Sequence, residues 1–121
     1  MGTQLIVAAS LFALPLFFNT AHASESAAAE NLKNFALSHC LYQAFPNSQA
    51  GEEAKAAAGG YVETGTLDAD AYAEAAELAR QFLAKKYASK SGNASLAVMK
   101  CIDLSQSTEL NAVATRYIQA R

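Results

Sequence analysis

The sequence has no tryptophan and few of the side chains that catalyse reactions near neutral pH, with two histidines and two cysteines in 121 residues. His22 lies in the N-terminal apolar region, and His39 adjoins Cys40. A catalytic nucleophile needs a base that the fold brings to it, and a structural or catalytic metal needs three or four ligands. We therefore expect no enzyme activity, no metal site and no cofactor.

A large net charge is also missing, because the formal charge at pH 7 is −2. Basic side chains are not interleaved with aromatic ones, the pattern of a nucleic-acid-binding surface, so we expect no nucleic-acid partner. The charges are nevertheless unevenly spread: residues 52–77 carry seven acidic side chains and one lysine, and residues 78–100 carry five basic and no acidic ones. Much of this asymmetry suits the dipole of one helix. The acidic side chains Glu63, Asp68, Asp70 and Glu74 are a candidate patch that steers a partner.

The N-terminal region lacks lysine and arginine in residues 1–4, where a signal peptide usually has them. Residues 5–18 form an almost unbroken apolar run, and residues 21–23 have the small-x-small pattern of a signal peptidase site. The run is shorter than the about 20 residues of a spanning helix, and no stop-transfer charges follow it. We expect residues 1–23 to be a signal peptide and residues 24–121 a single periplasmic domain that does not contact the membrane. A retained membrane anchor is the alternative.

Apolar residues recur at intervals of three and four, which predicts helices and no convincing strand. The expected helices cover about residues 26–44, 48–61, a stretch from 66 or 68 to 86, residues 94–104, and a last segment capped by Ser107. The first is apolar on so many sides that we expect it to be central or to lie in an oligomer interface. The paired glycines Gly59 and Gly60 suggest a close helix contact or a frayed end. The predicted fold class is all-α, a small bundle of about five helices.

The two cysteines, Cys40 and Cys101, lie in the first and fourth expected helices. Export permits a disulfide, and two cysteines allow only one intramolecular pairing. Closing a ring of this size stabilises the fold by roughly 4 kcal/mol in the loop-entropy model. We expect one disulfide that ties the first helix to the segment behind the preceding loop.

That loop, residues 87–93, contains the turn formers Ser89, Lys90, Ser91, Gly92 and Asn93. A small, exported, non-catalytic helical domain with a polar loop on a fixed base has the profile of a binding protein. The residues alone leave three choices: an inhibitor of another periplasmic protein, a chaperone, or a carrier of a small apolar ligand. The loop could also be a plain connection between helices.

Five blocks narrow the choice by resemblance: NFALSHCL at residues 34–41, GYV at 60–62, YASKSG at 87–92, MKCID at 99–103 and STEL at 107–110. In this order and spacing they resemble the type VI secretion amidase immunity proteins, specifically the fourth family, from residue 31 to residue 117. The Ala-rich second and third helices and the uncharged N-terminus depart from the pattern.

The resemblance implies a periplasmic, all-helical homodimer that binds and inhibits a cognate peptidoglycan amidase effector, a papain-like cysteine peptidase, in a heterotetramer. It also implies that a protruding loop enters the catalytic cleft of the effector. We assign this role to Ser89, Lys90, Ser91 and Gly92, and a second contact to the acidic residues Glu63, Asp68 and Asp70. The strongest rival is a periplasmic acid-stress chaperone of the helical, single-disulfide type, which would unfold and expose apolar surface at low pH.

Overall fold

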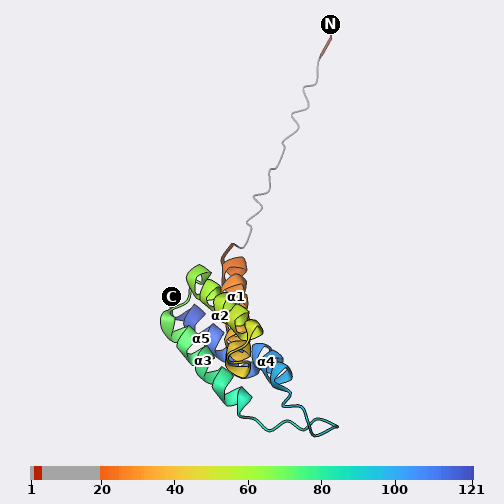
Figure 1. The fold of residues 1–121 in the computed structure, drawn as a ribbon. Helices are drawn as coiled ribbons and strands as arrows, with labels where there is room; N and C mark the ends of the chain where they lie inside the picture. The colour runs from red at the N-terminus through yellow and green to blue at the C-terminus, as the bar shows by residue number, and fades with distance from the viewer. Residues whose placement is uncertain (1, 4–19) are drawn as a thin grey trace.

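The computed structural model describes residues 2–3 and 20–121, and this part of the chain contains helices and no strands (Figure 1). The helices are α1 (Thr20–Ala44), α2 (Gln49–Thr64), α3 (Ala69–Leu83), α4 (Ala97–Ser105) and α5 (Thr108–Gln119). The expected all-α class is confirmed. None of these helices is long and apolar enough to cross a membrane. The apolar run at residues 5–18 lies outside the described residues, so the signal peptide stays a prediction.

Serine side chains start two of the helices, as their sequence positions predict. The Oγ of Ser48 accepts a hydrogen bond from the Gly51 amide at 3.0 Å, and the Oγ of Ser107 accepts one from the Leu110 amide at 3.1 Å. Helix α1 begins at Thr20, earlier than expected, and the added residues 20–25 include the strong helix formers Ala21, Ala23 and Glu25.

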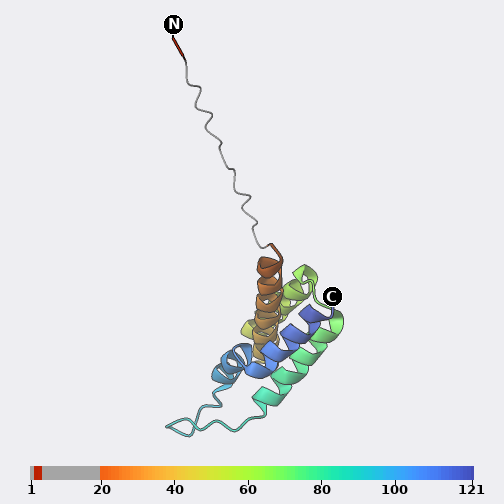
Figure 2. The same ribbon diagram turned by 180° about the vertical axis from the view of Figure 1, so that it is seen from behind.

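Helix α1 is the centre of the bundle and packs against each of the other four helices. Both views show α3 and α5 lying side by side (Figures 1 and 2). The largest fully buried side chains are Leu32, Leu104, Leu110, Cys40 and Cys101, so the two cysteines lie within the core. The central position expected of the first helix is confirmed.

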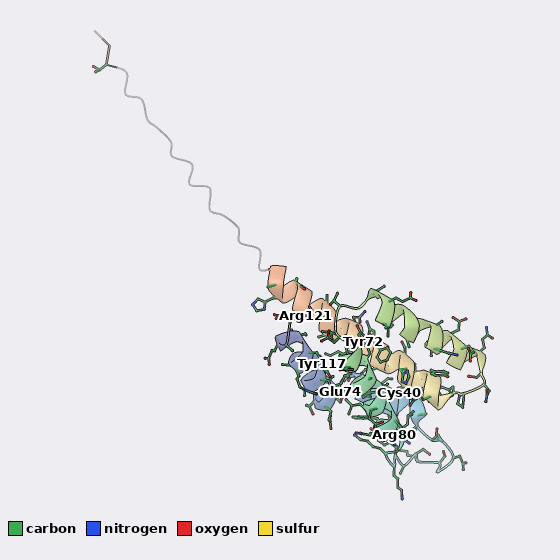
Figure 3. All side chains as sticks on the ribbon, turned by 90° about the vertical axis from the view of Figure 1, so that its left-hand side faces the viewer. Cys40, Tyr72, Glu74, Arg80, Tyr117 and Arg121 are labelled. Atoms are coloured by element: carbon green, nitrogen blue, oxygen red, sulfur yellow. A yellow bond between two sulfur atoms is a disulfide. The ribbon has the colours of Figure 1, made fainter. Side chains whose placement is uncertain are left out.

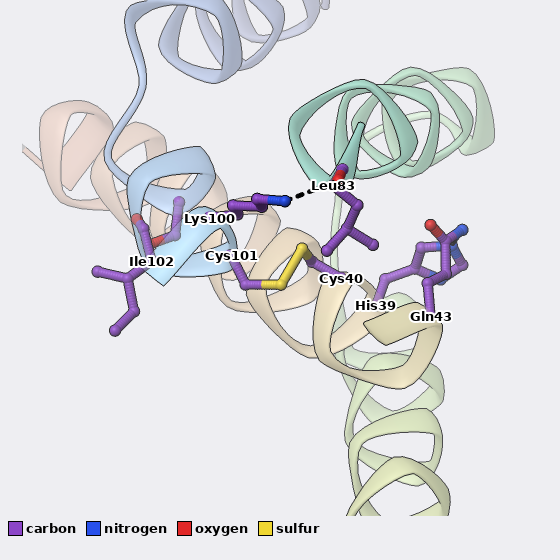
Figure 4. The surroundings of a disulfide bond; sticks show 8 residues. His39, Cys40, Gln43, Leu83, Lys100, Cys101 and Ile102 are labelled. Atoms are coloured by element: carbon purple, nitrogen blue, oxygen red, sulfur yellow. Dashed lines mark hydrogen bonds between the residues drawn. A yellow bond between two sulfur atoms is a disulfide. The ribbon is translucent and has the colours of Figure 1, made fainter. Parts of the chain in front are cut away.

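The predicted disulfide is present and joins α1 to α4 (Figure 4). The sulfur atoms of Cys40 and Cys101 are 2.07 Å apart, and neither residue is exposed to solvent. Because α4 has only nine residues, this covalent bond is a large part of what fixes the short helix on the bundle.

The glycines that allow close packing are not the ones suggested by the sequence. A Cβ at Gly59 or Gly60 would meet nothing within 4 Å, and α2 continues past both to Thr64, so the expected close contact or frayed end there is wrong. At Gly65, just after α2, a Cβ would instead overlap the hydroxyl of Tyr72. That hydroxyl donates to Oδ1 of Asn31 at 2.7 Å, so three segments meet here without room for a side chain.

Candidate functional site

The connection between α3 and α4, residues 84–96, extends beyond the helices at one end of the bundle (Figures 1 and 2). Its tip is a turn in which the Gly92 amide donates to the Ser89 carbonyl at 3.1 Å, with Gly92 at a φ of 73°. Lys90, Ser91 and Gly92 are exposed, and Ser89 is half-buried. The structure therefore gathers all four predicted loop residues at one projecting turn.

Two serine side chains stiffen this turn from within. The Oγ of Ser89 accepts a hydrogen bond from the Ala94 amide at 3.3 Å, and the Oγ of Ser91 accepts one from the Asn93 amide at 3.4 Å. The bond at Ser89 joins the two sides of the turn, and the bond at Ser91 lies within its second half, so both limit the conformations of the chain around Lys90. A charged side chain is thereby presented on a small, ordered support.

Three side chains clasp the base of the loop. The hydroxyl of Tyr87 donates to the Asp103 carboxylate at 2.6 Å, and this bond raises the pKa of Tyr87 because it favours the protonated phenol. The Lys100 ammonium donates to the carbonyl of Leu83, the last residue of α3, at 3.1 Å (Figure 4). The same ammonium lies 5.6 Å from the centre of the Tyr87 ring. Cys101 adjoins Lys100, so the disulfide holds the helix that carries the clasp.

The acidic residues predicted as a second contact lie at the opposite end of α3. Glu63 is in the last turn of α2, Asp68 precedes α3, and Asp70 is in its first turn. All three are exposed. Helix α3 has 15 residues, which at 1.5 Å per residue separates them from the loop by about 22 Å. The three residues are therefore far from the loop of the same protomer.

Glu74, grouped with the acidic patch in the sequence, is engaged within the fold instead. Its carboxylate accepts a hydrogen bond from Tyr117 at 2.7 Å and is bound by the Arg116 guanidinium at 2.9 to 3.1 Å, which ties α3 to α5 (Figure 3). The bonds from Tyr117 and Arg116 lower the pKa of Glu74. This carboxylate is therefore part of the bundle rather than of a free acidic surface.

His39 packs and hydrogen-bonds within its own helix. Its Nε2 accepts from the side-chain amide of Gln43 at 2.8 Å, and its ring stacks on Phe35 with 5.4 Å between the centroids. Partial burial lowers the pKa of His39, which favours the neutral ring. Among the described residues, no three His, Cys, Asp or Glu side chains are grouped so that they could hold a metal ion.

One surface beside the loop was not anticipated. Phe45, Val98, Met99 and Ile102 are exposed and line a shallow groove with residues 94–97 and Asp103. In the nine-residue helix α4, Cys101 and Leu104 are buried, so Val98 and Ile102, one turn apart, are left on the outer face. The sequence does contain a sign of this groove. Val98 and Ile102 are apolar residues four positions apart, and Cys101 and Leu104 already occupy the inner face of the same helix.

Comparisons with known proteins extend these observations. A family model described as "Type VI secretion system (T6SS), amidase immunity protein" (Tai4) matches residues 30–114, a span that contains both cysteines and the whole loop. Among solved structures, a chain of the Tae4/Tai4 effector–immunity system from Salmonella typhimurium, in a selenomethionine variant, is 36% identical with a TM-score of 0.67. The match covers 74% of this chain and 87% of that one. A comparison with curated proteins finds no significant match.

Proposed function

This chain belongs to the family of type VI secretion system amidase immunity proteins, and from that membership we propose that it binds and inhibits a cognate peptidoglycan amidase effector. Inhibition follows from occlusion of the cysteine-peptidase active site of the effector. The family consists of immunity proteins rather than enzymes, in agreement with the scarcity of catalytic side chains. The mature protein is proposed to act in the periplasm, where the substrate of such an amidase is located.

The observation that carries the proposal is the projecting turn formed by Ser89, Lys90, Ser91 and Gly92. A cleft is blocked by a convex element that keeps its shape, and this turn is exposed at its tip and hydrogen-bonded within itself. The clasp at its base and the disulfide behind it limit how far it moves. Little conformational entropy is then left to lose on docking, which favours tight binding.

In the proposed mechanism, Ser89, Lys90 and Ser91 occupy the space that the stem peptide takes in the amidase. The ammonium of Lys90 and the hydroxyl of Ser91 supply hydrogen-bond donors close to the catalytic cysteine and histidine of the effector. Ser89 and Gly92 keep the turn closed and are not themselves the main contacts. The inhibitor thus fills the site without presenting a flexible segment for cleavage.

The test replaces Lys90 and Ser91 together with alanine and titrates inhibition of the cognate amidase. We expect at least tenfold weaker inhibition, in the range for loss of one interfacial hot spot, with an unchanged circular dichroism spectrum. Lys55→Ala, an exposed lysine on α2, is the matched control and should inhibit normally. Equal potency of the double variant and the wild type would remove the loop from the mechanism.

The acidic residues Glu63, Asp68 and Asp70 are proposed to contact the effector held by the loop of a second protomer. One protomer presents the loop and the acidic surface at opposite ends of α3, so a homodimer, and a heterotetramer with two effectors, places both on the same effector. Light scattering of the protein, alone and mixed with the amidase, tests these assemblies. A monomer in the first sample and a complex of one protomer with one amidase in the second would contradict them.

Charge on this surface should act mainly on the association rate. The variant carrying Glu63→Gln, Asp68→Asn and Asp70→Asn is expected to associate more slowly and to lose part of the salt dependence of the rate. An association rate that is the same at low and high salt in the wild type would remove the steering role.

Mass spectrometry of the exported protein tests the signal peptide separately, with Ser24 as the expected first residue.

A further inference from the structure

The apolar groove at the start of α4 gathers most of the exposed large apolar side chains in the part of the chain that the structure describes. These are Phe45, Val98, Met99 and Ile102, between 37% and 53% exposed, and only Val62 lies elsewhere. Single exposed apolar residues are ordinary on a protein surface, whereas a contiguous group of them marks an interaction site. The clustering therefore indicates that a binding partner covers these side chains.

We propose that this groove is the apolar centre of the contact with the amidase effector, seated on an apolar ridge beside the catalytic cleft. The inference rests on the proposed function and adds to it a second binding surface on the same protomer. In this arrangement the turn at Lys90 enters the cleft and sets the position of the complex. The groove supplies most of the buried apolar area.

Continuity with the loop argues for this occupant. Residues 94–97 line the groove and follow the turn directly, and Asp103, which also lines it, is the residue that holds Tyr87 at the base of the loop. A protein that encloses the loop down to its base therefore lies against the groove. A separate partner would have to leave the groove before the amidase could bind.

The size of a stable interface gives a second argument. Specific complexes bury about 800 Å² on each partner through roughly 20–30 residues. The turn contributes four residues and the acidic surface of a second protomer contributes three, so surfaces flanking the turn have to provide most of the remainder. On the α3 side the flank carries Lys85 and Lys86, and on the α4 side it carries the groove. Interface centres are apolar and depleted of lysine, with methionine enriched. The α4 side therefore fits the centre of the interface better than the α3 side does.

The test compares Met99→Glu and Ile102→Glu with Val62→Glu, a control at a similarly exposed apolar residue on α2, away from the loop. All three side chains face solvent in the free chain, so the variants should fold. Met99→Ala, which removes apolar area without adding charge, is the second groove variant. The proteins are exported and purified from the periplasm. Their affinity for the cognate amidase is measured by calorimetry, and their molar mass by light scattering.

We expect the glutamate variants in the groove to weaken binding at least thirtyfold and Met99→Ala about tenfold, while Val62→Glu stays within twofold of the wild type. Molar mass in the absence of amidase should not change. Undiminished affinity of the groove variants would overturn the inference and leave the loop mechanism standing. A changed molar mass in the absence of amidase would also overturn it, whatever the amidase affinity, and would assign the groove to contact between copies of this chain. Failure of the wild type to bind would instead refute the proposed function itself.

Discussion

The hydroxyl of Tyr87 lies 2.6 Å from the carboxylate of Asp103, so the start of the loop is bonded to the helix that follows it. At the other end of the bundle, Tyr117 makes a similar bond of 2.7 Å to Glu74. The two tyrosine–carboxylate pairs have the same donor and acceptor groups, although the second is less exposed and also includes Arg116, and only the first adjoins the loop. They provide a matched comparison between a bond that positions the loop and one that joins two helices.

We predict that Tyr87→Phe weakens inhibition of the amidase roughly fivefold, the effect of losing one hydrogen bond, without a measurable change in the helical content. The reason is that the loop then explores more conformations before docking. Tyr117→Phe removes the same chemical group and should leave inhibition unchanged. Inhibition titrations of the two variants decide the matter, and equal potency would show that the Tyr87 bond does not position the loop.

Removal of the disulfide should have the largest effect on stability of any change considered. Replacing Cys40 and Cys101 together with alanine opens a ring closed at a sequence separation of 61 residues, which the loop-entropy model values at roughly 4 kcal/mol. The free energy of unfolding in urea measures this. Reduction of the wild type in urea should give a similar loss. A difference below about 1 kcal/mol would mean that the unfolded chain is already restrained.

Two glycine substitutions should have opposite signs. At Gly59, inside α2, a Cβ meets open space, so Gly59→Ala should stabilise the protein by about 1 kcal/mol through helix propensity. At Gly65 a Cβ would overlap the Tyr72 hydroxyl and crowd Asn31, so Gly65→Ala should destabilise it by about 1–3 kcal/mol. Thermal unfolding of both variants beside the wild type tests this. A neutral Gly65→Ala would show that Tyr72 moves aside at little cost.

The helices could be predicted because their determinants are local in the sequence. The disulfide could be predicted because two cysteines have only one possible intramolecular pairing. Apolar spacing marks each helix, Ser48 and Ser107 mark two of the starts, and two cysteines have one possible partner each. The central position of α1 followed from its unusually wide apolar surface. None of these inferences requires knowledge of how the helices are arranged in space.

Features that depend on the arrangement of helices could not be predicted from the sequence. Glu74 belongs to an acidic stretch in the sequence, yet α5 brings Arg116 and Tyr117 to it from far along the chain. The apolar pair on α4 is visible in the sequence, but the groove also needs Phe45, which comes from just after α1 and is brought there only by the packing of α1 against α4. Likewise, nothing local shows that Gly65 lies against Tyr72, whereas Gly59 and Gly60 look like contact glycines and face open space.

Glu74 also predicts how stability depends on pH. The bonds from Tyr117 and Arg116 lower the pKa of Glu74 in the folded protein, so the ionised carboxylate stabilises the fold at pH values above the ordinary pKa of 4.5. That contribution is lost as the pH falls from 4.5 through the lowered pKa. We expect the urea midpoint to decrease in this window and Glu74→Gln to decrease less. Glu63→Gln, on an exposed carboxylate without these partners, should follow the wild type, and identical curves for Glu74→Gln and wild type would contradict the assignment.

The same titration separates an immunity protein from an acid-stress chaperone. Acid unfolding is driven by buried histidines that must become charged and by paired carboxylates that must be protonated. The core of the described residues contains no buried polar or charged side chain, and its disulfide does not titrate. His39, whose pKa is lowered by partial burial, is only half-buried, so its protonation does not require the core to open. Loss of the Glu74 contacts at the surface should therefore lower stability without opening the bundle. We expect an unchanged helical circular dichroism spectrum and no increase in the binding of a hydrophobic dye between pH 7 and pH 3, where a chaperone of this type would unfold and bind much more of the dye.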